Sequence, residues 1–121
     1  MKDHSNPVTE SDVVKFAGFI ATWQTALNLG DWRLIYSDKP AKGSMAEVDI
    51  SVSDHTAVYR IGKHFGSEKV TDLSLEQTAL HELIHVLLAE YCEMAKAKAT
   101  DELLMAAEHR IVHTLERLLV K

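Results

Sequence analysis

Hydrophobic and polar residues follow two different periods along the chain, and these periods predict helices towards both ends with strands between them. From about Glu10 to Leu29 the apolar residues recur at the spacing expected of a helix with one buried face, namely Val13, Phe16, Ala17, Ile20, Trp23 and Leu27. Thr9 or Ser11 is the candidate N-cap. Gly30 is expected to end the helix in a left-handed conformation.

The period changes to two after Asp31, which predicts strands. Residues 32–36 alternate first, and residues 46–53 form the clearest strand, with Ala46, Val48, Ile50 and Val52 on the side that should be buried. Residues 53–55 suit a turn, and residues 57–61 give a third short strand. Because the connections are short, the three strands are expected to form an antiparallel meander.

Helical periodicity returns in the second half of the chain. Ser74-Leu75-Glu76-Gln77 has the form of a capping box, so a long helix is expected to start near Leu75 and run to about Ala99. Thr100-Asp101 is a second cap, followed by a helix that carries Leu104, Ile111, Val112, Leu115, Leu118 and Leu119 to the C-terminus. The predicted fold class is α+β, with an N-terminal helix, a small three-stranded, mainly antiparallel sheet and two C-terminal helices.

Composition restricts the function more than it restricts the fold. The 121 residues are 46% hydrophobic and 26% charged, as expected of one globular domain over residues 1–121. A net charge of −5 disfavours a general nucleic-acid or anionic-membrane surface, and no apolar run is long enough to cross a membrane. Cys92 is the only cysteine and the first residues lack an apolar signal segment, so a cytoplasmic location is expected.

The candidate chemistry lies in the first of the two C-terminal helices, where residues 81–85 read HELIH. His81 and His85 are four residues apart, so both imidazoles project from one face of the helix and can bind one zinc ion. Glu82 points to the adjacent face, where a carboxylate can accept a proton from a zinc-bound water. The pattern therefore predicts a zinc site with Glu82 as general base.

A catalytic zinc normally has three protein ligands, so a third must lie elsewhere. The metzincin continuation is absent, because Leu88 and Tyr91 occupy the positions of its glycine and third histidine. In the last helix the apolar residues lie within roughly 80° of Glu108, and a carboxylate in such a stripe favours a cation partner. His109 and His113 lie among charged residues on the solvated side. Periodicity therefore favours Glu108 as the third ligand.

The segment His81-Glu82-Leu83-Ile84-His85, with Glu108 in the following helix, resembles the gluzincin clan of zinc metallopeptidases. Most similar are its minimal single-domain members and the small metallopeptidase-like proteins encoded by phages and prophages. The resemblance covers nearly the whole chain and implies a zincin-like fold. By that resemblance His81, His85 and Glu108 would bind Zn²⁺, and Glu82 would be the base in hydrolysis of a peptide or protein substrate.

Two parts of the gluzincin site have no motif in this sequence. Larger gluzincins carry an acid four residues after the ligand glutamate, where this chain has Val112. They also have a Tyr or His that stabilises the oxyanion, for which Tyr59, Tyr91 and His109 are candidates here. An extended substrate would add to an edge strand, for which residues 57–61 are the candidate.

Two alternative functions are also compatible with the sequence. One is a zinc-binding module of the same fold without catalytic activity, because a chain of this length leaves little for a second lobe to wall a cleft. The other is an interaction protein in which the HExxH pattern of residues 81–85 (His-Glu-x-x-His, where x is any residue) arose by chance. His55 carries no spacing signal and is expected to face solvent.

Overall fold

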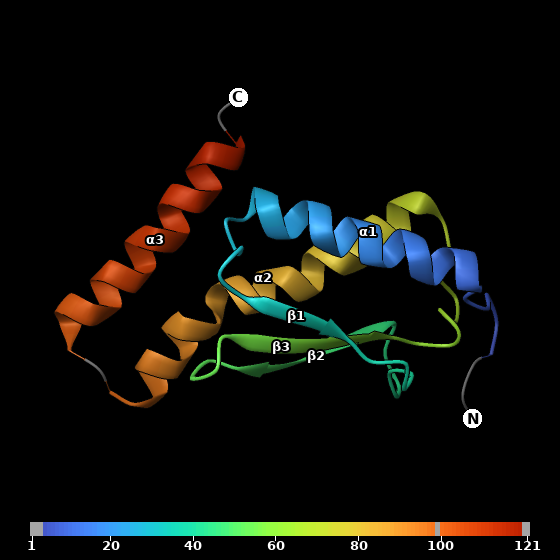
Figure 1. The fold of residues 1–121 in the computed structure, drawn as a ribbon, viewed down its shortest axis with the longest axis horizontal. Coiled ribbons are helices and arrows are strands. Elements are labelled where there is room, and N and C mark those ends of the chain that lie inside the picture. The colour runs from blue at the N-terminus through green and yellow to red at the C-terminus, as the bar shows by residue number, and fades with distance from the viewer. Residues whose placement is uncertain (1–3, 99, 120–121) are drawn as a thin grey trace.

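The computed structural model describes residues 4–98 and 100–119, and within them the chain has an α+β fold (Figure 1). In order, the elements are α1 (Glu10–Ala26), β1 (Arg33–Tyr36), β2 (Ala46–Ser51), β3 (Thr56–Ile61), α2 (Asp72–Lys96) and α3 (Asp101–Leu119). The predicted α+β class and the predicted order of one helix, three strands and two helices are confirmed. In this part of the chain, no helix combines the length and the apolar character needed to span a bilayer.

Helix α1 begins as predicted and ends earlier. Thr9 is the N-cap: its hydroxyl accepts a hydrogen bond from the Asp12 amide at 3.2 Å, and the Asp12 carboxylate accepts one from the Thr9 amide at 2.9 Å. The expected left-handed stop at Gly30 is wrong, because Asn28 takes the positive φ of 59°. Gln24 then fixes the following loop by donating to the carbonyl oxygen of Trp32 at 2.9 Å.

The sheet is mixed, and the expected antiparallel meander is wrong. Its strand order is β1-β3-β2, with β1 parallel and β2 antiparallel to the central β3. The segment that joins β1 to β2 crosses the end of β3 at Gly62, whose amide donates to the Met45 carbonyl oxygen at 2.8 Å. A Cβ at position 62 would lie 2.9 Å from the Ser44 carbonyl oxygen, so this crossing needs glycine.

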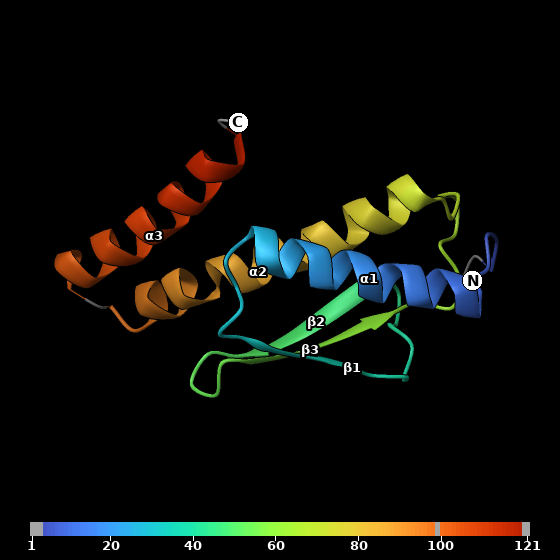
Figure 2. The same cartoon turned by 45° about the horizontal axis from the view of Figure 1, so that its top comes forward.

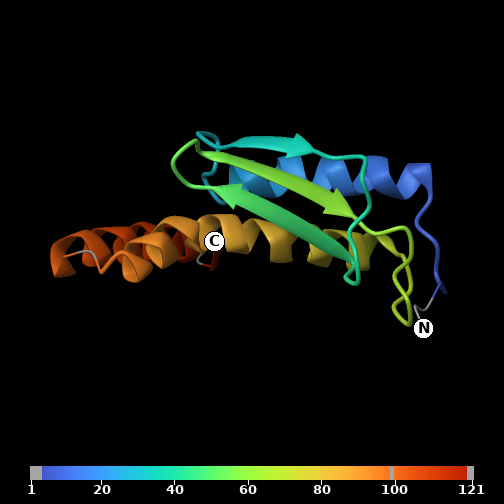
Figure 3. The ribbon, with the colours of Figure 1, turned by 90° about the horizontal axis from the view of Figure 1, so that it is seen from below.

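Helices α1 and α2 lie side by side on one face of the sheet, which gives a two-layer body (Figures 1 and 2). The inward residues of β3 meet them, and the rings of Tyr59 and Phe16 lie 6.0 Å apart between sheet and α1. Figure 3, in which the molecule is seen from below with the sheet in front of α1, shows β2 running beside α2. The most completely buried large side chains come from both helices and the loops around them: Phe16, Leu27, Leu75, Leu83 and Val86.

Helix α2 begins three residues before the predicted start. Its N-cap is Thr71, whose hydroxyl accepts from the Ser74 amide at 3.1 Å, while the Ser74 hydroxyl oxygen accepts from the Thr71 amide at 2.9 Å. The expected box of Ser74 with Gln77 is therefore wrong. Ser74 lies in the first turn of α2 and is 5% exposed. Its hydroxyl donates to the carbonyl oxygen of Lys69, in the loop before the helix, at 2.7 Å.

Helix α3 turns back beside the C-terminal half of α2, and its far end lies away from the sheet (Figures 1 and 2). Thr100 begins it, as predicted: its hydroxyl accepts from the Leu103 amide at 3.3 Å. A small hollow between α2 and α3 is lined from α3 by Ala107, Arg110, Ile111 and Thr114.

Candidate active site

The two histidines of the HExxH segment lie together on α2. The ring centroids of His81 and His85 are 5.0 Å apart, with an angle of 76° between the ring planes. Both side chains are exposed, while the neighbouring Leu83 and Val86 point into the core. One helical turn therefore presents two imidazoles to solvent, next to the side of α2 that meets the sheet.

Glu82 lies between the histidines and the sheet. It is only 7% exposed, and no hydrogen bond or ion pair to its carboxylate forms within the described residues. Burial raises the pKa of Glu82, the neighbouring His81 and His85 act to lower it, and the carboxylate of Glu47 on β2 raises it further. A carboxylate with a raised pKa is better matched to moving protons near neutral pH.

Two hollows between α2 and β2 meet at Glu82, which lines both of them. The first, here the His81 hollow, is lined by Ser44, Met45, Ala46, Glu68, Ser74, Gln77, Thr78, His81 and Glu82. The second, here the His85 hollow, is lined by Ala46, Glu47, Val48, Asp49, Ile50, Val52, Glu82, His85, Ala89, Cys92, Glu93 and Lys96. Together they form a groove along β2, with the HExxH residues on its α2 side.

The strand over this groove is β2 and not β3. Because β3 is paired on both sides, residues 57–61 cannot take up an added strand, and the expectation that they form the edge is wrong. Within the described residues β2 pairs only with β3, so its other edge has no strand partner, as the addition of an extended peptide would require. Local alternation predicted the strands but not their order, which depends on the crossing at Gly62.

Glu108 does not lie with the histidines. Its side chain is exposed on α3, and the expected position in a buried apolar stripe is wrong. The contacting face of α3 carries Ala107 and Thr114, and successive helical residues are about 100° apart, so Glu108 lies well round the helix from Ala107. Val112 and Leu115, which belong to the same stripe, are 47% and 39% exposed.

The donor set is therefore incomplete as a catalytic zinc site. His81 and His85 suit two positions of a tetrahedral ion, but a third protein ligand is normally required. Among residues 4–98 and 100–119, no three His, Cys, Asp or Glu side chains are grouped so that they could hold one metal ion.

The three candidates for oxyanion stabilisation also lie outside the groove. Tyr59 is buried in the core, where its ring is stacked on Tyr36 at 5.7 Å. Tyr91 lines the hollow between α2 and α3, and His109 is exposed on α3. None of the three lines either hollow beside Glu82.

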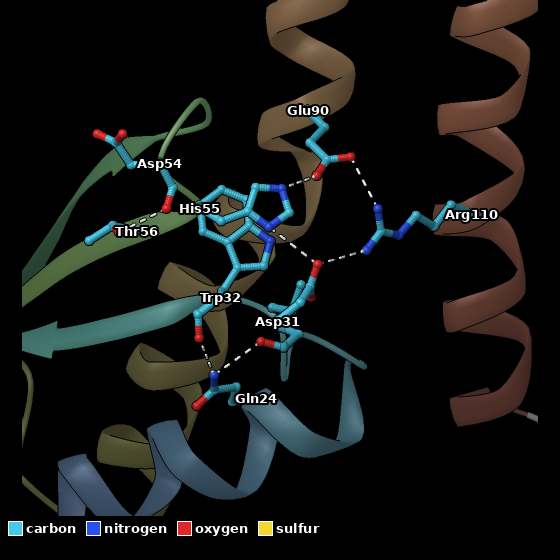
Figure 4. Close-up of polar contacts among 9 residues, drawn as sticks. Gln24, Asp31, Trp32, Asp54, His55, Thr56, Glu90 and Arg110 are labelled. Atoms are coloured by element: carbon cyan, nitrogen blue, oxygen red, sulfur yellow. Dashed lines mark hydrogen bonds and ion pairs between the residues drawn. The ribbon is translucent and has the colours of Figure 1, made fainter.

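A polar cluster at the other end of the body was not predicted. His55, expected to face solvent, is half-buried and stacked on Trp32 with ring centroids 4.6 Å apart (Figure 4). Its Nδ1 lies 3.2 Å from Asp31 Oδ2 and its Nε2 lies 2.8 Å from Glu90 Oε1. Arg110 of α3 reaches both carboxylates, at 3.5 Å and 3.2 Å respectively. These partners come from four separate segments, so no local spacing could indicate them.

No protein-family model, curated protein or solved structure matches this chain.

Proposed function

We propose that the chain is a zinc-dependent peptidase of the HExxH type that acts on a peptide lying along β2. The observation that carries the proposal is the arrangement at Glu82, where a buried carboxylate without a partner in the described part of the chain lies between two adjacent imidazoles and an open strand edge. This combination brings a base, two metal ligands and a place for an extended backbone to one groove.

Each part of the groove has a distinct role in this proposal. A zinc ion held by His81 and His85 would polarise the peptide carbonyl and acidify a water molecule. Glu82 would accept the proton of that water and pass it to the leaving nitrogen, for which its raised pKa is suited. The open edge of β2 would hold the substrate backbone by main-chain hydrogen bonds. Glu108 remains the third ligand favoured by the sequence pattern, although it lies apart from the histidines in this structure.

The alternative is a zinc-binding module of the same fold without peptidase activity. It is favoured by one observation: in the part of the chain that the structure describes, no third Cys, His, Asp or Glu is grouped with His81 and His85, and no Tyr or further His lines the groove opposite Glu82.

Metal content per chain tests the site itself. After reconstitution with zinc and desalting, we expect close to one zinc per chain in the wild type and none in the double variant His81→Ala, His85→Ala. The matched control is His109→Ala, His113→Ala, a pair with the same spacing on the exposed side of α3, which should keep its zinc. Glu108→Ala tests the third ligand separately. A wild type that retains no zinc would overturn the proposal.

Peptide cleavage distinguishes the peptidase from the zinc-binding module without peptidase activity. We expect the wild type to cleave members of a peptide library, as read by mass spectrometry, and Glu82→Gln to keep its zinc while kcat falls by about 10²–10⁴-fold. A Glu82→Gln variant as active as the wild type would contradict the role of the base. A zinc-loaded wild type that cleaves no peptide would favour the module.

A further inference from the structure

We propose that the groove selects basic peptides, and that Glu68 binds a lysine or arginine side chain of the peptide in the His81 hollow. This inference rests on the proposed function, because it assumes that a peptide lies along β2. It names the chemical class of that peptide, which the HExxH segment does not indicate.

The two hollows differ in whether a cationic side chain accompanies their carboxylates. The His81 hollow has Glu68 and Glu82 in its lining, and neither lysine nor arginine lines it. The His85 hollow includes Lys96 in its lining, and its Glu47 and Asp49 are paired with Arg60 at 3.3 Å and 2.7 Å. The His81 hollow is therefore the part of the groove whose acidic side chains lack a lysine or arginine beside them.

Neither carboxylate of the His81 hollow has a hydrogen-bond or ion-pair partner among the residues that the structure describes. Glu82 is more than nine-tenths buried, opens into this hollow, and forms no hydrogen bond or ion pair within residues 4–98 and 100–119. The Glu68 carboxylate is likewise without a bond in this range, although the Glu68 amide donates to the Phe65 carbonyl oxygen at 3.3 Å. A buried charge with no partner costs free energy, and a cationic group bound beside it reduces that cost.

The remaining lining suits a long basic side chain. Met45 is 38% exposed and lies with Ala46 in the wall formed by the start of β2, which offers apolar surface to the methylene stem of lysine or arginine. Glu68 belongs to the loop before α2 and supplies an exposed carboxylate for the charged head. Apolar wall and acid together distinguish a basic side chain from an apolar one of similar length.

Matched peptides test this selection. Fluorescent eight-residue peptides with one lysine, norleucine or glutamate in an otherwise alanine–threonine background are titrated with the full chain, and affinity is read from anisotropy. We expect lysine at one peptide position to bind roughly three- to tenfold more tightly than norleucine, and glutamate to bind most weakly. In Glu68→Gln the preference should disappear, whereas in Glu93→Gln, which changes the His85 hollow, it should persist.

Three results would overturn the inference: no measurable binding of any peptide, equal binding of the lysine and norleucine peptides, or a lysine preference that survives Glu68→Gln. Cleavage of the same peptides is scored separately by mass spectrometry. A lysine preference that depends on Glu68 without cleavage would support the selection of basic peptides and count against the peptidase. Cleavage without a lysine preference would support the peptidase and overturn the selection of basic peptides.

Discussion

Two buried ionisable side chains, Glu82 and Tyr59, differ in what surrounds them. Burial raises the pKa of both groups, but Glu82 opens onto a groove and Tyr59 lies between α1 and the sheet. The carboxyl group of Glu82 can exchange protons with a molecule bound in the groove. The phenol of Tyr59 is enclosed by the core, so its ionisation affects only the stability of the fold, which it lowers at alkaline pH.

Tyr59→Phe should reduce the loss of stability at alkaline pH. Burial raises the pKa of Tyr59 above its ordinary value of 10.0, and the neighbouring Tyr36 adds to the shift. The unfolded chain therefore releases this proton first, so the free energy of unfolding falls as the pH rises through about 10. Urea unfolding at pH 8 and pH 10.5 measures the loss, and Tyr91→Phe is the control. An equal alkaline loss in Tyr59→Phe and wild type would contradict this assignment.

Glu108 shows what a helical pattern can predict about a single residue. Of the apolar stripe that includes Glu108, Ile111 and Leu118 pack against the core. The face of α3 that meets α2 is turned away from the rest of the stripe and carries Ala107 and Thr114, which leaves Glu108 exposed. His81, Glu82 and His85 were better determined, because their relation depends only on the geometry of one helical turn. A relation between two helices depends on tertiary packing, which a periodicity does not contain.

At the scale of elements, all the predicted helices and strands are present, and the errors lie at their ends and in their order. Thr71 and Ser74 are both good N-caps with a suitable partner three residues later, so sequence preference alone does not choose between them. The choice depends on the contact of the Ser74 hydroxyl with Lys69 in the preceding loop. The strand order likewise depends on how the segment before β2 crosses the end of β3 at Gly62, which the alternation within each strand does not indicate.

Thr71→Ala should lower the free energy of unfolding by about 1 kcal/mol, because it leaves the Ser74 amide at the start of α2 without its side-chain acceptor. Gln77→Ala is the matched control, since Gln77 is exposed and lies within the helix. It should change stability by less than about 0.5 kcal/mol. Urea unfolding monitored by circular dichroism measures both. A larger effect of Gln77→Ala than of Thr71→Ala would restore Ser74 as the N-cap.

At the scale of the whole molecule, the body and α3 are held together in different ways. The body has a continuous core between two helices and a sheet, whereas α3 contacts it along one side and leaves Leu103, Met105, Val112 and Leu115 exposed. The polar cluster of Asp31, His55, Glu90 and Arg110 joins α3 to the body (Figure 4). Since little apolar surface holds α3 in place, its position should depend strongly on this cluster.

Arg110→Ala should loosen α3 without unfolding the body. The substitution removes the contacts of α3 with Glu90 and Asp31, while His55 still bridges those two carboxylates within the body. Because Arg110 is 48% exposed, we expect a loss of at most about 1 kcal/mol, which increases the opening of α3 by up to about fivefold. Amide hydrogen exchange should therefore accelerate in residues 101–119 and stay unchanged in α1 and the sheet.

Arg117→Ala is the control, since Arg117 is exposed on the same helix without an ion pair in the described residues. Equal exchange of α3 in the two variants would show that apolar packing, and not the cluster, holds the helix in place.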